Sequence, residues 1–131
     1  MSNSIIITVS LKKSNSNPPK LKLKDSTDNL AGYESAINGD LTTEVEPNNN
    51  IIWIPNTISG ISELTNIEAK DPKTGLDLLK DKKVRKIENR LEGTIVSNSP
   101  GKGKKMPYKI GFKIYRDEEE YWSDPVLQMK I

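Results

Sequence analysis

Hydrophobic and polar residues alternate along most of this chain with a period of two, the spacing of side chains on one face of a β-strand. The alternation predicts a first strand over residues 5–12 and, after a turn at Ser14–Pro19, a short strand over residues 20–24. In that short strand three lysines alternate with two leucines. Lysine rows of this kind protect the edge of a sheet from unwanted pairing, so we expect the strand at an edge.

The middle of the chain predicts two more strands around a tight turn. Leu41–Val45 and Ile51–Ile54 are strand-like, and the residues between them, Pro47–Asn50, are turn formers. Residues 25–39 are rich in Asp, Ser, Asn and Gly, which predicts a connection between sheets, with a helical turn near Leu30–Ile37 as one option.

Two segments are compatible with either helix or strand. The apolar residues at positions 58, 61, 64 and 67 are three apart, but Gly60 and the β-branched side chains favour a strand or loop. Residues 76–91 also fit a helical stripe, whereas the strict alternation over Arg85–Val96 predicts one continuous strand. We expect that strand, preceded by one helical turn at Asp77–Lys83.

The last third has the clearest pattern. Ser97–Met106 predicts a basic loop, Tyr108–Ile114 a strand with an apolar face, Asp117–Glu120 a turn, and Val126–Ile131 a closing strand. Seven to nine short strands with turns at intervals of roughly ten residues predict an all-β fold. We expect a single antiparallel Greek-key β-sandwich with at most one short helix, forming one domain over residues 1–131. Its predicted core contains Ile7, Val9, Trp53, Ile110 and Phe112.

Neighbouring residues of a strand face opposite ways, so Tyr121 and Trp122 cannot both lie in that core. We expect Trp122 to point inward and Tyr121 to be partly exposed.

One segment resembles a known family. Val45-Glu46-Pro47-Asn48-Asn49-Asn50-Ile51-Ile52-Trp53 resembles the cupredoxin signature, in which a turn containing Pro-Gly-Asp precedes an apolar strand that ends near an aromatic residue. Asparagines replace the glycine and aspartate, and asparagine also occupies tight turns. The order of the later strands, at Arg90–Val96 and Tyr108–Phe112, is similar as well. Immunoglobulin-like sandwiches show the same spacing, so the resemblance implies a cupredoxin-like or immunoglobulin-like sandwich.

Histidine and cysteine are both absent from the 131 residues. The copper centre that a cupredoxin implies needs imidazole and thiolate ligands, so this chain lacks the copper ligands. The commonest acid–base, nucleophilic and zinc sites cannot be built either. We therefore expect no catalytic residues, no cofactor and no transition metal, and we interpret Met106 and Met129 as gap-filling side chains.

Charge clusters remain as candidate sites in a chain whose formal net charge is only +2. The glycine and lysine loop at residues 101–105 lacks the spacing of a phosphate-binding P-loop. A second basic cluster, at residues 80–86, would join it in a patch for nucleic acid or an acidic partner. The acidic turn at residues 117–120 offers oxygen ligands for calcium without matching an EF-hand. The candidate interaction residues are Lys102, Lys104, Lys105, Asp117, Glu118, Glu119, Glu120 and Tyr121.

These observations predict a non-enzymatic structural or protein-interaction module that self-assembles through strand edges or binds a protein partner. Both terminal strands, together with the two charge clusters, are the expected contact regions. The alternative is a small carbohydrate- or ligand-binding sandwich, lectin-like and calcium-assisted, that uses loop carboxylates and an exposed aromatic residue. We do not expect nucleic acid as a partner, because the net charge is small and exposed aromatics are few.

A secretory signal contains an apolar run of about 7–15 residues, whereas this sequence passes from Met1 to the short run Ile5–Ile7. We expect no conventional signal peptide. No apolar stretch reaches the roughly 18 residues that span a bilayer. We therefore expect no membrane span and a cytoplasmic or particle-associated protein, with signal-independent export left open.

Overall fold

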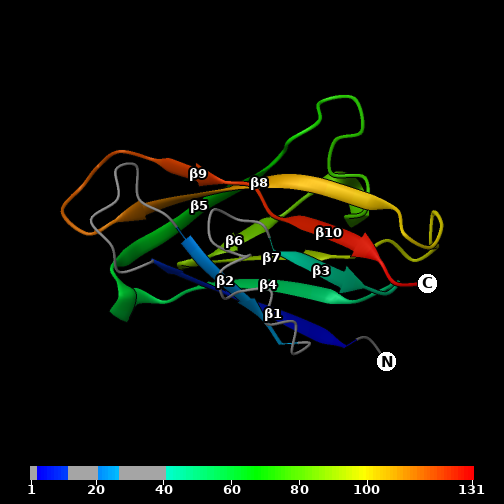
Figure 1. Ribbon diagram of the computed structural model, residues 1–131, viewed down its shortest axis with the longest axis horizontal. Helices are drawn as coiled ribbons and strands as arrows, with labels where there is room; N and C mark the ends of the chain where they lie inside the picture. Colours follow the sequence, from blue (N-terminus) through cyan, green and yellow to red (C-terminus); the bar gives the residue numbers. More distant parts are fainter. Residues whose placement is uncertain (1–2, 12–20, 27–40) are drawn as a thin grey trace.

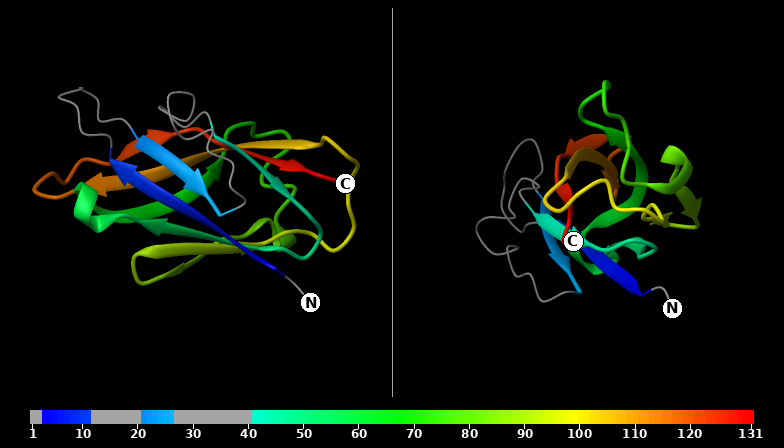
Figure 2. Two further views of the ribbon diagram at one scale, coloured as in Figure 1. Left: turned by 60° about the horizontal axis from the view of Figure 1, so that its bottom comes forward. Right: turned by 90° about the vertical axis from the view of Figure 1, so that its right-hand side faces the viewer.

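The computed structural model describes residues 3–11, 21–26 and 41–131. Over these residues the chain forms two stacked β-sheets and no α-helix, as Figure 1 and Figure 2 show, so the predicted all-β sandwich is confirmed at that level. No helix in these ranges has the length and hydrophobicity needed to cross a membrane. The turn expected at Ser14–Pro19 and the connection with its helical option near Leu30–Ile37 lie outside the described residues.

The first sheet has the strand order β2-β1-β4-β7-β6. Its strands are β1 (Ser4–Leu11), β2 (Leu21–Asp25), β4 (Asn50–Pro55), β6 (Arg85–Ile87) and β7 (Arg90–Thr94). The lysine-bearing strand β2 lies at the edge, as predicted.

The second sheet has the order β3-β10-β8-β5, and β9 also pairs with β8. Its strands are β3 (Thr42–Val45), β5 (Ile61–Ala69), β8 (Lys105–Ile114), β9 (Tyr121–Ser123) and β10 (Val126–Met129). Along β8 the partner strands β9 and β10 follow one another in the same register, because Ser123 faces Ile110 and Val126 faces Pro107.

Strand direction and number differ from the prediction. The described part of the chain contains ten strands rather than seven to nine, and both sheets are mixed rather than antiparallel. β1 runs parallel to β4, and β3 runs parallel to β10. The prediction was wrong because period-two alternation specifies which face of a strand is buried, and a parallel and an antiparallel neighbour bury the same face.

The segment Arg85–Val96 forms a hairpin and not the continuous strand that the alternation predicted. β6 and β7 pair with each other in antiparallel register, and Glu88 and Asn89 form the two-residue turn between Ile87 and Arg90. Glu88 adopts a φ of 56°, which reverses the chain there. The helical option for residues 76–91 is also wrong, apart from a short 3-10 turn at Lys80–Lys82 (η2) inside the predicted Asp77–Lys83 turn.

Glu88→Gly is expected to raise the free energy of unfolding by about 0.5–1 kcal/mol. A positive φ costs a residue with a side chain roughly 1–2 kcal/mol, and this gain exceeds the extra entropy that glycine gives the unfolded chain. Thermal unfolding of the two proteins measures the difference. Asn89→Gly is the matched control, since Asn89 in the same turn has no positive φ. An equal stabilisation by both substitutions would contradict this explanation.

Strand β5 explains the threefold spacing that had left helix and strand open. Its register against β8 shifts twice, between Ile61 and Glu63 and again between Leu64 and Asn66. Each β-bulge adds one residue to a strand, so positions three apart face the same side. Ile61, Leu64 and Ile67 are all buried as a result. A 3-10 turn, η1 (Thr57–Ser59), precedes the strand, and Ile58 in it is exposed.

The predicted core is confirmed, because Ile7, Val9, Trp53, Ile110 and Phe112 all lie in one buried hydrophobic cluster. Met106 and Met129 are buried in the same cluster, which agrees with the gap-filling interpretation. At its centre the Trp53 Nε1–H group donates a 3.0 Å hydrogen bond to the Tyr108 hydroxyl. The two rings pack edge to face with their centroids 5.7 Å apart.

The asparagine turn before β4 is built as its composition predicted. Asn48 has a φ of 67°, a conformation that asparagine tolerates better than most residues. The buried Asn49 side chain accepts a 2.7 Å hydrogen bond from the Glu46 backbone N–H and donates to the Asn3 carbonyl. The amide side chain of Asn49 therefore ties the turn to the start of the chain.

Side chains link the two sheets at both sides of the sandwich. On one side the Thr43 hydroxyl of β3 donates a 2.7 Å hydrogen bond to the buried Asp25 carboxyl of β2. On the other side Lys86 of β6 forms a 2.6 Å ion pair with Glu63 of β5. The Lys86 hydrogen bond holds the pKa of Glu63 below its ordinary value. This exposed pair contributes little stability, but it connects β6 and β5, the outer strands of their sheets.

Candidate functional site

The acidic turn at residues 117–120 lies between β8 and β9 and is organised by a tyrosine. The Tyr121 hydroxyl is 2.6 Å from Asp117 Oδ2 and 3.2 Å from Glu119 Oε2, and the Glu119 backbone N–H donates to Asp117 Oδ1. The hydrogen bond from Tyr121 is the main cause that lowers the pKa of Asp117, and the same bond raises the pKa of Tyr121. Glu118 and Glu120 have exposed side chains.

The orientation expected for the Tyr121-Trp122 pair was wrong at Trp122. Tyr121 faces Phe112 across the sheet, with ring centroids 5.9 Å apart, and is partly buried against the core. Trp122 therefore points outward, where 38% of it is exposed. It lies opposite Gly111, where a Cβ atom would approach the indole ring to 3.0 Å. Because Gly111 has no side chain, the indole ring fits over β8. The alternation of residues around Trp122 does not reveal this space, since Gly111 belongs to another strand.

The outer face of Trp122 is not an open stacking platform. The Lys109 ammonium lies 5.5 Å from the centroid of the indole ring, close enough for a cation–π contact. On the opposite side the ring covers the glycine of β8. Trp122 is thus held between a lysine and the sheet. This arrangement fits a structural role better than the carbohydrate contact considered for an exposed aromatic residue.

The basic loop occupies residues 97–104 and leads directly into β8. Gly101 and Gly103 both have positive φ, and the surrounding residues are mostly exposed. Lys102 and Lys105 have exposed side chains, whereas Lys104 is half-buried and lies 3.6 Å from Asp77. Because Asp77 is three residues before Lys80, this contact brings the basic loop to the segment that carries the second basic cluster.

The basic loop and the acidic turn lie at opposite ends of the molecule. They follow the two ends of β8, which has ten residues and spans about 30 Å. In Figure 1 the acidic turn is the orange loop at the left end and the basic loop is the yellow one at the right end. The structure therefore does not bring the eight candidate residues together in one site. It separates them into a positive end and a negative end.

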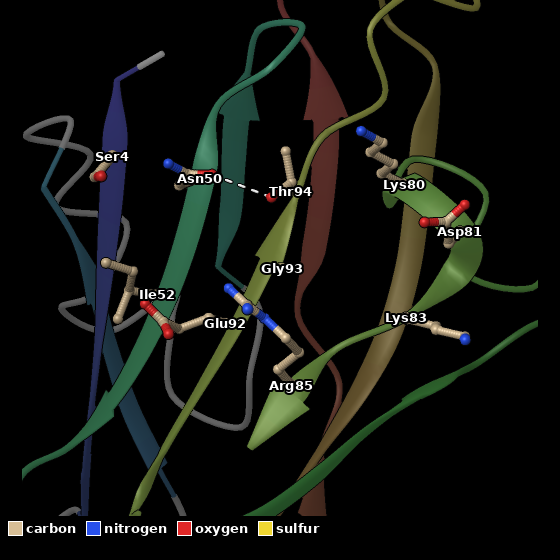
Figure 3. Close-up of a pocket in the computed structure, with 10 residues that line it drawn as sticks. All are labelled: Ser4, Asn50, Ile52, Lys80, Asp81, Lys83, Arg85, Glu92, Gly93 and Thr94. Carbon is tan, nitrogen blue, oxygen red and sulfur yellow. Dashed lines mark hydrogen bonds between the residues drawn. The ribbon is translucent and has the colours of Figure 1, made fainter. Parts of the chain in front are cut away.

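A polar pocket that the sequence did not predict opens beside β7. Figure 3 shows the residues that line it. Its volume is about 340 Å³. Strands β1, β4, β6 and β7 contribute to its lining together with the η2 turn. The lining includes Ser4, Asn50, Lys80, Arg85, Glu92 and Thr94. Lys80 and Arg85 had been considered only as members of the second basic cluster.

No group of three carboxylates is arranged to hold a metal ion in the described ranges 3–11, 21–26 and 41–131. In the acidic turn the carboxylates of Asp117 and Glu119 contact the Tyr121 hydroxyl, whereas Glu118 and Glu120 have exposed side chains. The donors of this turn therefore do not fit the calcium site considered for it.

Comparison of the sequence with models of known protein families and with curated protein sequences finds no match. The charged ends and the pocket are therefore the features of this protein that bear on its function.

Proposed function

We propose that this protein is a non-enzymatic interaction module that associates with copies of itself head to tail. The observation that carries the proposal is the placement of exposed charges of opposite sign at the two ends of the long axis. A heterologous contact between the positive end of one copy and the negative end of the next repeats without closing, which produces chains of subunits. Complementary charge also steers the two ends toward each other.

The negative end is preorganised for such a contact. The Tyr121 hydroxyl and the Glu119 backbone N–H together fix the Asp117 carboxylate, and the turn then presents Glu118 and Glu120 to solvent. A turn held in one conformation loses less entropy when it binds. At the positive end, Lys102 and Lys105 are the exposed cations available to it.

Charged ends support association better than the terminal strands do. β1 lies between β2 and β4, and β10 lies between β3 and β8, so both terminal strands already have neighbours on two sides. Outer strand β5 carries two bulges, and outer strand β2 carries lysines; both features discourage strand addition. We therefore propose that self-association uses the two charged ends, and not the edges of the terminal strands that the sequence had suggested.

We also propose which type of β-sandwich this protein forms, namely a cupredoxin-like or immunoglobulin-like one. Two stacked sheets and the strand β4 that follows the Pro47–Asn50 turn support this placement. Without histidine or cysteine in the chain, a cupredoxin-like scaffold here works without the copper centre.

A charge-exchange experiment tests head-to-tail association. Glu118→Lys/Glu120→Lys removes the net negative charge of residues 117–120, and Lys102→Glu/Lys105→Glu reverses the net charge of residues 101–105. We expect wild type to form oligomers at low ionic strength that dissociate as salt screens the contact. Each double variant alone stays monomeric, and an equimolar mixture of the two associates again. Light scattering coupled to size exclusion measures the masses, and circular dichroism checks the folds.

The matched control is Lys73→Glu, which reverses an exposed charge outside both ends and should leave oligomer mass unchanged. A wild-type protein that remains monomeric at the highest attainable concentration and low salt would refute the proposal. So would a mixture of the two double variants that stays monomeric.

The second candidate function is binding of a small ligand, and the pocket beside β7 is the observation that favours it. The volume of about 340 Å³ lies at the lower end of the range of roughly 300–1,000 Å³ for small-molecule sites. The sequence suggested a carbohydrate- or ligand-binding site at loop carboxylates and an exposed aromatic residue. We now propose this pocket as the binding site of that alternative.

A further inference from the structure

The pocket exists because β6 is too short to cover the whole of β7. β6 pairs with residues 90–92 of β7, and the next contact along that side is the bridge between Leu79 and Ile95. Between these contacts, residues 80–84 leave β7 and return. The space enclosed by this excursion lies beside Gly93 and Thr94, as the close-up in Figure 3 shows.

Two consecutive residues of the excursion have an unusual backbone. Asp81 has a φ of 59° and Lys82 a φ of 54°, although neither is glycine. Such conformations are costly and concentrate at sites that clamp a ligand. Asp81 itself lines the pocket, so the strained turn forms part of its rim.

The lining carries charges of both signs. Lys80, Lys83 and Arg85 contribute three cations, against the carboxylates of Asp81 and Glu92. In Figure 3 the Arg85 guanidinium extends across β7 toward Glu92, whereas the ammonium groups of Lys80 and Lys83 point away from Arg85. Among the described residues neither Arg85 nor Lys80 forms an ion pair. A planar guanidinium in this position suits a carboxylate, which it binds through two parallel hydrogen bonds.

The opposite wall supplies neutral hydrogen-bonding groups. The Thr94 hydroxyl donates a 3.1 Å hydrogen bond to Asn50 Oδ1, which fixes the orientation of the Asn50 amide. Its amide nitrogen then has two donors for a ligand, and the Ser4 hydroxyl lies at the same wall. Glu92 adds a strong acceptor for hydroxyl protons. Amide, hydroxyl and carboxylate groups together match the hydroxyls of a sugar ring.

We infer that the pocket binds a monosaccharide-sized sugar acid. Its carboxylate lies against Arg85, and its hydroxyls lie against Asn50, Thr94 and Glu92. The Glu92 carboxylate places a negative charge close to Arg85. This charge repels a phosphate dianion more strongly than the singly charged carboxylate of a sugar acid, so the pocket favours the sugar acid. This inference rests on the second candidate function, and it is independent of head-to-tail association.

Titration of the isotope-labelled full chain with three compounds tests it, with backbone amide NMR shifts as the readout. The compounds are galacturonate, galactose and galactose 6-phosphate. We expect galacturonate to shift the amides of Asn50, Glu92 and Thr94, and to bind about tenfold or more tightly than the other two compounds. Arg85→Gln should weaken galacturonate binding by about tenfold or more. Arg90→Gln removes the same charge from the exposed start of β7 and should leave it unchanged.

The outcomes separate the ligand class from the site. Equal binding of galactose, tighter binding of the phosphate, or insensitivity to Arg85→Gln would overturn the sugar-acid assignment while leaving a ligand-binding pocket. If none of the three compounds shifts the pocket amides, both the assignment and the second candidate function fail. Retained dispersion of the amide spectrum shows that each variant is folded.

Discussion

Phe112→Ala is expected to lower the free energy of unfolding by about 3–5 kcal/mol. The Phe112 ring is 1% exposed and lies in β8, the central strand to which β5 and β9 both pair at this position. Truncation removes the transfer free energy of the ring and leaves a cavity that the paired backbone cannot close. Chemical denaturation of wild type and variant measures the loss.

Tyr115→Ala is the control for Phe112→Ala, because this aromatic residue follows the same strand but is 56% exposed. It should change the free energy of unfolding by only about 0.5 kcal/mol or less. If Phe112→Ala lost no more stability than this control, the ring would not occupy a well-packed core, and the packing of the second sheet would be wrong.

Tyr108→Phe should lower the free energy of unfolding by about 1–3 kcal/mol, although it removes only one oxygen atom. The Trp53 Nε1–H group donates to the Tyr108 hydroxyl, and both residues are fully buried. Without the hydroxyl, no described side chain replaces it as the hydrogen-bond acceptor of that indole. Burial also raises the pKa of Tyr108, so the hydroxyl stays protonated through the neutral range.

A double-mutant cycle separates this hydrogen bond from the packing of the rings. Trp53→Phe removes the donor, and the pair Trp53→Phe/Tyr108→Phe removes both polar groups. We expect the double variant to lose less stability than the sum of the single variants, by about 0.5–3 kcal/mol. Additive losses in urea denaturation would show that the two groups do not interact in solution.

The buried faces of the strands were readable from the sequence. In β1 and β8 every second residue is apolar, and those residues form the core, because a strand buried on one face needs only that local alternation. The edge position of β2 was readable for a similar reason. A row of lysines discourages the addition of a further strand, and such rows therefore occur at sheet edges.

Other features required information from distant parts of the chain. The parallel pairing of β1 with β4 joins residues more than forty positions apart, and nothing in either strand specifies the direction of its neighbour. The bulges of β5 and the turn at Glu88 changed which residues share a face, and their positions became clear only from the pairing with β8 and between β6 and β7. The predicted orientation of Trp122 was wrong because the room for its indole ring is provided by Gly111 of the paired strand β8.

For the candidate sites as well, some features follow from the sequence and others only from the tertiary structure. The sequence by itself determined the all-β class, the core residues and the two charge clusters, because alternation, size and charge are properties of single residues and their near neighbours. Only the tertiary structure decided that the clusters lie at opposite ends of β8, that the terminal strands are interior, and that Arg85 meets Asn50 and Thr94 around a pocket. Those relations depend on strand direction and register, which are fixed by packing and hydrogen bonding between segments far apart in the chain.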